Sequence, residues 1–323
     1  MSSSISSSSM RLSQESGTDF TGYSRRYTAV WLASLVTTFL IFLGASEILV
    51  RFQVEPNDLL LKHASLMTAS RTANAVFGDS HASLGFTGQA HFINLAFPGE
   101  NLQTIASKVD YYFSNKSPGY VIFQLGPHQF SERRNSEVGL DYRNADWKPG
   151  LLRTLSSWYR PRILDFWQVY LRGDGFQVNR RLEPDGAQII GSNLVEMSVN
   201  DRRAQAERAV RDQIPPVIPS EAKAARLAET ALRALVQQGA QICLVTFPVS
   251  PDQAELSVKY PEVLATRRYI DQLANDLGLQ RMDYWSALRD FSQFTNSDHL
   301  NASGAAGLAA RAVADCGFSE PKG

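Results

Sequence analysis

An uncharged apolar run near the N-terminus constrains this chain more than any other feature of its sequence. Residues 27–46 carry no charged side chain and are rich in Leu, Val, Phe, Ile and Thr. At a rise of about 1.5 Å per residue, ~20 such residues cross the roughly 30 Å hydrocarbon layer of a bilayer. The run therefore predicts a transmembrane helix, which we place at residues 27–50.

Charges on either side of the run predict its orientation. Arg11, Arg25 and Arg26 precede it, and Glu47 is the first of several acidic residues that follow it. Because positive charge is retained on the cytoplasmic side, residues 1–26 should form a cytoplasmic tail, Ser-rich and disordered, and the large domain should be extracytoplasmic. In a bacterium this describes a single-pass inner-membrane protein with a periplasmic domain.

Two other interpretations of the run stay open. A signal peptide has a shorter apolar core, roughly 7 to 15 residues, and a cleavage site of small residues, which Gly44-Ala45-Ser46 could imitate. The run could also be a buried helix in the core of a soluble domain.

Downstream, short apolar runs alternate with helical patterns. After a juxtamembrane linker at 51–71, this alternation predicts an α/β domain at 72–318, interrupted by a less regular insertion at about 131–218. Strands separated by helices of this length are typical of a three-layer α/β/α sandwich with a mainly parallel, five-stranded sheet. The expected strands are 73–77, 91–95, 120–125, 241–247 and 279–284, and the expected helices are 102–113, a helix N-capped by Ser220 and ended by Gly239, 262–277 and 303–315.

Composition narrows the possible partners and the redox chemistry. The 32 basic residues cancel the 32 acidic ones, which disfavours a nucleic-acid partner because phosphate binding relies on a basic excess or patch. Cys243 and Cys316 are too few for a disulfide scaffold and lack the spacing of metal ligands. We expect buried free thiols, with a bridge between the two cysteines as the less favoured alternative.

Polar and glycine residues follow three of the expected strands, at the sheet edge where ligands gather in parallel sheets. They are Gly78-Asp79-Ser80-His81, Pro98-Gly99-Glu100-Asn101 and Gly126-Pro127-His128-Gln129, and the segment Asn296 to Asn301 precedes the last helix. In this order, over about 72–130 and 240–314, they resemble the sequence blocks of the SGNH (GDSL) hydrolase superfamily. The pair of GDSH with a late DHLNxxGA resembles in particular the SGNH proteins that transfer or remove acetyl groups on extracellular polysaccharides.

The resemblance implies a catalytic role for each block. A serine hydroxyl attacks well only when an imidazole accepts its proton, so Ser80 is the candidate nucleophile and His299 the candidate base. The oxyanion donors would be the N–H groups of Ser80 and Gly99 and the side chain of His128, and Asn101 is a further candidate for substrate binding.

Two positions depart from the family pattern. The family has Asn where this chain has His128, and Asp where it has Asn296. An imidazole can donate to an oxyanion, although its protonation depends on pH. Asn can hold a histidine but cannot balance its positive charge, so Asp298 is the expected substitute if the chain turns there.

The acidic and histidine residues near the expected site also allow a structural and a metal interpretation. We expect Asp79 to hold the nucleophile loop through backbone hydrogen bonds. Together, Asp79, His81, His128, Asp298 and His299 could bind zinc or manganese. No HxH or HxxxH spacing supports such a site, so we predict neither metal nor cofactor.

The sequence therefore predicts a membrane-anchored serine acyl-ester hydrolase or O-acetyltransferase that acts on an extracytoplasmic polysaccharide. Its expected partners are a carbohydrate polymer, the lipid bilayer, and polysaccharide-export or acetyl-donor membrane proteins. The alternative is a catalytically weakened SGNH-fold scaffold subunit of a polysaccharide assembly or export system, which the substitutions at His128 and Asn296 favour.

Overall fold

A computed structural model describes most of the chain outside the N-terminal tail. The predicted tail at 1–26 lies largely outside the described residues, which are 20–89, 91–143, 151–156, 159, 163–172, 180–190, 192–215 and 218–318.

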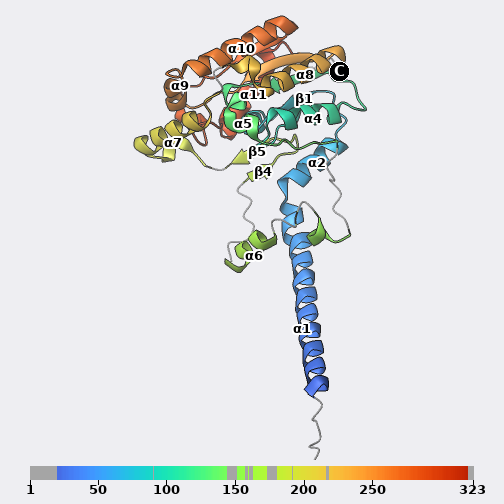
Figure 1. Ribbon diagram of the computed structural model, residues 1–323. Helices are drawn as coiled ribbons and strands as arrows, with labels where there is room; N and C mark the ends of the chain where they lie inside the picture. Colours follow the sequence, from blue (N-terminus) through green and yellow to red (C-terminus); the bar gives the residue numbers. More distant parts are fainter. Residues whose placement is uncertain are drawn as a thin grey trace, which may run out of the picture.

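A long N-terminal helix projects from the rest of the protein (Figure 1). Helix α1 (Phe20–Leu49) continues into a π-helical turn, η1 (Val50–Val54). Residues 26–54 have a window of mean hydropathy 1.9, and no part of that window is buried, so the interpretation as a core helix is wrong. By length and composition this helix is able to cross a membrane.

The predicted linker is largely helical. A 3₁₀ turn, η2 (Glu55–Asn57), leads to α2 (Leu59–Ala69). The Asp58 carboxylate caps α2 by accepting the N–H groups of Leu60 and Leu61, both at 3.0 Å. Such caps satisfy N–H groups that have no acceptor inside the helix. The Asp58 carboxylate therefore fixes the point at which α2 begins after η2.

Five parallel strands form the central sheet, which confirms the predicted fold class. Their spatial order is β2-β1-β3-β6-β7, and each neighbouring pair is parallel. All five lie within the apolar runs that predict them, and each is shorter than its run. The strands are β1 (Ala75–Phe77), β2 (Ile93–Asn94), β3 (Tyr120–Gln124), β6 (Gln241–Thr246) and β7 (Gln280–Asp283).

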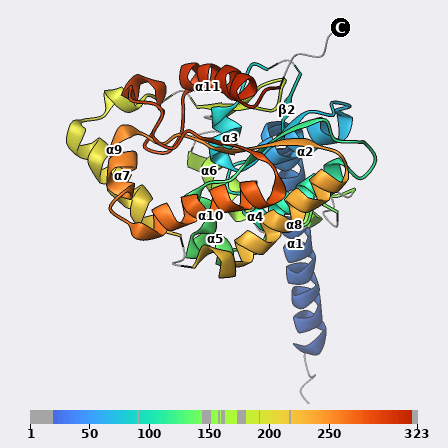
Figure 2. The ribbon, with the colours of Figure 1, turned by 90° about the horizontal axis from the view of Figure 1, so that it is seen from above.

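Helices cover both faces of the sheet (Figure 2). Helices α4 (Leu102–Tyr112), α8 (Lys223–Gln237) and α10 (Pro261–Leu277) pack on one face, with Phe77 and Phe123 in that core. Helices α3 (Ser80–Gly85) and α11 (Ala302–Asp315) cover the other, where Val76 and Ile122 are buried. Successive strand residues therefore enter opposite cores, as the pleat requires, and each large apolar side chain so buried contributes about 1.5 to 3 kcal/mol.

The expected start of α8 is wrong by two residues. Ser220 lies inside a 3₁₀ turn, η7 (Pro219–Glu221), and the N-cap of α8 is Ala222, which makes no side-chain cap. Pro219 favours this turn because its fixed φ suits a first helical position and delays the α-helix.

The insertion contains several short elements. In the described residues these are α5 (Glu132–Ser136), η4 (Arg153–Leu155), α6 (Ile163–Arg172), an antiparallel pair β4 (Arg180–Leu182) and β5 (Gln188–Ile190), η6 (Leu194–Glu196) and α7 (Val199–Asp212). The remaining short helices in the described part of the chain are η3 (Pro127–Phe130), α9 (Pro251–Ser257) and η8 (Phe291–Gln293).

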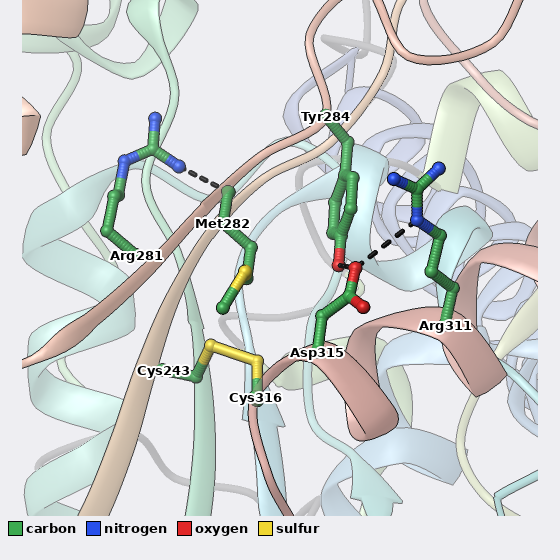
Figure 3. Close-up of a disulfide and its surroundings, with 7 residues drawn as sticks. All are labelled: Cys243, Arg281, Met282, Tyr284, Arg311, Asp315 and Cys316. Atoms are coloured by element: carbon green, nitrogen blue, oxygen red, sulfur yellow. Dashed lines mark hydrogen bonds and ion pairs between the residues drawn. A yellow bond between two sulfur atoms is a disulfide. The ribbon is translucent and has the colours of Figure 1, made fainter.

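The expectation of two free thiols is wrong, because Cys243 and Cys316 form a disulfide (Figure 3). Cys243 lies in β6 with its side chain toward the α11 face, and Cys316 is the C-cap of α11. Their Cα atoms are 5.9 Å apart although 73 positions separate them in the sequence. Next to the bridge, the Tyr284 hydroxyl donates to Asp315 at 2.8 Å. The bridge therefore fastens the last helix to β6, the strand between the central strand β3 and the edge strand β7.

Removing this bridge should cost stability. The cross-link closes a long loop, so the Cys243→Ser/Cys316→Ser variant should lose about 2 to 5 kcal/mol of unfolding free energy. Urea unfolding of the detergent-solubilised chain measures this loss. Intact mass under non-reducing conditions should show the wild type lighter by two hydrogen atoms than its reduced form. A wild type at the reduced mass would contradict the bridge.

Candidate active site

The nucleophile candidate lies at a tight turn between β1 and α3. Asp79 is the N-cap of α3, and Ser80 is its first residue, so the Ser80 N–H has no acceptor within the helix. Gly78 permits the turn, because a Cβ there would lie 2.2 Å from the side-chain oxygen of Gln124. The sequence Gly-Asp-Ser thus meets a steric requirement as well as a chemical one.

The side chain of Gln124, at the end of β3, holds this turn through hydrogen bonds. Its Oε1 accepts the N–H groups of Asp79 at 3.0 Å and of Ala82 at 2.9 Å, and its Nε2 donates to Asp79 Oδ1 at 2.7 Å. Sequence analysis missed this residue. The available signal is an amide side chain at the buried end of an otherwise apolar strand, where a polar group requires partners.

His299 faces Ser80 from the other end of the chain. Its Nε2 lies 2.7 Å from Ser80 Oγ, although 219 positions separate the two residues. The loop that carries His299 turns because Asn296 Oδ1 accepts the N–H groups of Asp298 at 3.1 Å and His299 at 2.9 Å. The structure therefore brings the predicted nucleophile and base within hydrogen-bond distance.

Two acceptors lie at the other nitrogen of His299. Nδ1 is 2.9 Å from Asp298 Oδ1 and 3.0 Å from Asn296 Oδ1. The second Asp298 oxygen accepts from Gln213 Nε2 at 2.8 Å, and Gln213 in turn accepts from Gln253 at 3.1 Å. Burial opposes ionisation of Asp298, but the charge and hydrogen bond of His299 outweigh it and hold the pKa of Asp298 below its usual value. A charged carboxylate at this place would stabilise a protonated His299.

His128 is bonded to Asp79 through one of its two ring nitrogens. Its Nε2 lies 2.6 Å from Asp79 Oδ2, and its Nδ1 has no hydrogen-bond partner among the described residues. An oxyanion bond from His128 would therefore have to come from Nδ1. The ring stacks on His81 with centroids 4.0 Å apart, and His81 lies 5.0 Å from the His299 ring.

The Asp79 carboxylate is within hydrogen-bond distance of the rings of both His81 and His128. It is fully buried, and its Oδ1 accepts the His81 backbone N–H at 3.0 Å, as expected, and lies 3.2 Å from His81 Nδ1. Burial alone would raise the pKa of Asp79, but His128 and the hydrogen bonds from both histidines hold it well below its usual range. Asp79 is therefore a buried anion whose acceptor positions are occupied by donors.

The second oxyanion candidate, Gly99, follows β2 in a loop that is bonded to the nucleophile turn. Phe97 N–H donates to the Gly78 carbonyl at 3.2 Å, and Gly99 has a φ of 85°, which favours glycine. The side chain of Asn101, the further candidate for substrate binding, is bonded within the fold. Its Oδ1 caps α4 by accepting the Thr104 N–H at 3.0 Å, and its Nδ2 donates to the Glu137 carbonyl at 2.8 Å. These bonds explain its burial through the fold alone.

Three of the five residues considered for a metal site do lie together. Candidate ligand atoms of Asp79, His81 and His128 are within 4.8 Å of one another. Two ligands of one zinc ion are about 3 Å or more apart, given metal–ligand bonds of 2.0 to 2.2 Å. The 2.6 Å between Asp79 and His128 is shorter and matches a charge-assisted hydrogen bond. The observed geometry of this trio is that of a hydrogen-bonded network.

Fold and site together define the class: an α/β/α sandwich with a serine–histidine pair at the carboxyl edge of a parallel sheet. No family model matches the chain, and no curated protein matches its sequence. Among solved structures, it is similar to a lipase/acylhydrolase from Enterococcus faecalis, with a TM-score of 0.38 and 11% identity, over 77% of this chain and 99% of that one. So distant a likeness says nothing of activity, and our interpretation of the site depends on its geometry.

The buried His81 predicts a dependence of stability on pH. Burial, and next the charge of His128, lower the pKa of His81 to about 4. In the unfolded chain the value is about 6.5, so the unfolded state takes up a proton first and stability falls as pH drops from 6.5 toward 4, by roughly 3 kcal/mol. Buried His63, whose pKa burial and the charge of Lys108 also lower, acts in the same direction.

The variant His81→Phe keeps a ring against His128 and removes the titrating group. Urea unfolding of the solubilised chain between pH 7 and 4.5 should therefore show a shallower acid loss in the variant than in the wild type. Equal slopes in the two proteins would contradict the buried, neutral His81.

Proposed function

We propose that this protein is a membrane-anchored serine acyl-ester enzyme, an esterase or O-acetyltransferase, that acts on an extracytoplasmic polysaccharide. The observation that carries the proposal is the 2.7 Å contact between Ser80 Oγ and His299 Nε2, with a carboxylate oxygen 2.9 Å from Nδ1 of the same ring. This is the geometry in which an imidazole activates a serine hydroxyl.

The proposed reaction has two acyl transfers. Ser80 Oγ attacks the ester carbonyl carbon, and its proton passes to His299 Nε2. The tetrahedral oxyanion is held by the N–H groups of Ser80 and Gly99, and its collapse breaks the C–O bond while His299 returns the proton to the leaving alcohol. The acetyl group on Ser80 is then attacked by water or by a sugar hydroxyl, whose proton passes to His299. Collapse of this second tetrahedral intermediate breaks the bond between the acetyl carbon and Ser80 Oγ, His299 returns the proton to Oγ, and acetate or the acetylated sugar leaves.

Two observations support the extracytoplasmic setting. A helix of 29 residues, Arg26–Val54, is apolar enough to cross a bilayer, its most apolar window is unburied, and Arg25 and Arg26 lie at its start. The Cys243–Cys316 disulfide is the kind of bond that persists in oxidising compartments. The polysaccharide target is supported by the likeness of GDSH and DHLNxxGA to acetyl-handling SGNH proteins.

A serine-directed fluorophosphonate probe tests the proposal. The detergent-solubilised full chain should react, and Ser80→Ala should not. Ser83→Ala is the matched control, since Ser83 lies in the same helix, fully buried, with no hydrogen-bond partner for its hydroxyl in the described structure, so this variant should label normally. Failure of the wild type to label would favour the scaffold alternative. That alternative is also supported by the bond of His128 Nε2 to Asp79, which leaves this nitrogen unable to bind an oxyanion.

Asp298 and Asn296 can be separated by their effects on turnover. If Asp298 stabilises protonated His299, Asp298→Asn should lower kcat/KM for p-nitrophenyl acetate by about 10²- to 10⁴-fold. Asn296→Asp supplies the same acceptor oxygens to the loop and should retain activity. A large loss in Asn296→Asp with little change in Asp298→Asn would assign the orienting role to Asn296.

A further inference from the structure

The insertion carries an exposed apolar surface beside the domain-proximal end of α1. We call this surface the collar and define it as residues 151–155 together with α6. Figure 1 shows α6 below the α/β domain, next to the upper end of the long helix. Five collar leucines are exposed, with Leu151 87% and Leu171 77% accessible; the others are Leu152, Leu155 and Leu164.

The first part of the collar is fixed to α1 through Glu47. The Glu47 carboxylate accepts the backbone N–H groups of Arg153 and Thr154, both at 3.0 Å, and the Thr154 hydroxyl at 3.2 Å. Arg51 donates to the Leu151 carbonyl. A chain segment about 100 positions further on is thus held by the first acidic residue after the apolar run.

The second part of the collar, α6, is fixed to α1 at Ser46, one residue before Glu47. Trp167 Nε1 donates to the Ser46 hydroxyl at 2.8 Å, and its ring stacks on Phe42 with centroids 5.7 Å apart. At about 100° per residue, Leu164 and Leu171 lie within roughly 60° of Trp167 on α6. The exposed leucines are therefore on the flank of α6 next to the residue that contacts α1.

These contacts place the collar at a defined level of the anchor. Ser46 is the last residue of the uncharged run and Glu47 is the first charge after it, so a bilayer crossed by residues 27–46 has its domain-side boundary here. Tryptophan is favoured at that boundary because its ring is apolar and its N–H is polar. Leucines held at this level in water would remain an unfavourable exposed apolar surface.

We propose that the collar is a second membrane-binding surface, which lies in the interfacial layer of the bilayer that α1 crosses. This proposal depends on the membrane anchoring stated in the proposed function. The occupant is lipid because Trp167 of the collar stacks on Phe42, one of the exposed apolar side chains that α1 would present to the bilayer. An interfacial helix needs an apolar flank and a polar one, and Gln168 and Arg172 supply the polar flank of α6.

Fluorescence quenching in vesicles tests the collar directly. Single cysteines replace Leu164, Leu171, Leu35 in α1 and Val236 in α8, in the full chain with its native disulfide. Each is coupled to a fluorophore, and the chains are reconstituted into phosphatidylcholine/phosphatidylglycerol vesicles. Nitroxide lipids labelled near the headgroup should quench the probes at 164 and 171 at least about twofold more than the exposed probe at 236.

The probe at 35 separates this proposal from the anchoring on which it depends. Leu35 is exposed in the middle of α1 and should be quenched by nitroxides near the acyl-chain ends. Quenching at 35 but not at 164 and 171 would overturn the collar alone, and no quenching at any site would overturn the anchor as well. The cysteines at 164 and 171 can also be treated with a water-soluble thiol reagent. If they are protected from it in native membranes but not in lipid vesicles, the occupant is a protein and the lipid assignment is overturned.

Discussion

The site depends on the hydrogen bonds that the buried Asp79 carboxylate accepts. An unpaired charge at such a place would cost several kcal/mol, so the fold must surround it with donors. It does so with the His81 backbone N–H, Gln124 and the rings of His81 and His128. Three of the four donors are on the nucleophile helix or on β3, so satisfying the charge also fixes the turn that presents Ser80. Stability and catalytic geometry therefore share one set of hydrogen bonds.

The same network fixes the ring of His128, at a position where the SGNH pattern that the sequence resembles has Asn. An asparagine has no ring to stack and no need of a carboxylate partner, whereas the imidazole stacks on His81 and bonds Asp79 through Nε2. With that nitrogen committed, stabilisation of an oxyanion would rely mainly on backbone N–H groups. Loss of one oxyanion donor typically lowers the rate of acyl transfer about 10²- to 10³-fold.

The sheet was predictable from sequence because its signals are local. A run such as YVIFQL, ended by Gly126, carries its own strand signal, and the carboxyl ends of parallel strands meet at one edge. The meeting of Ser80 and His299 follows from that rule. Gln124 and Gln213 were missed because a glutamine has no role until its partners are known. The Cys243–Cys316 bridge was only the less favoured alternative, because two cysteines 73 positions apart give no spacing signal.

The insertion, whose role could not be predicted from its sequence, contacts both α1 and the loop that carries His299. At one end, Gln213 donates to Asp298, and Gln205 at 2.9 Å accepts the N–H of Ser297, so α7 and its C-cap hold the loop that carries the base. At the other end, the collar is bonded to Glu47 and Ser46 of the anchor. One chain segment therefore contacts both the membrane-proximal helix and the loop beside the nucleophile.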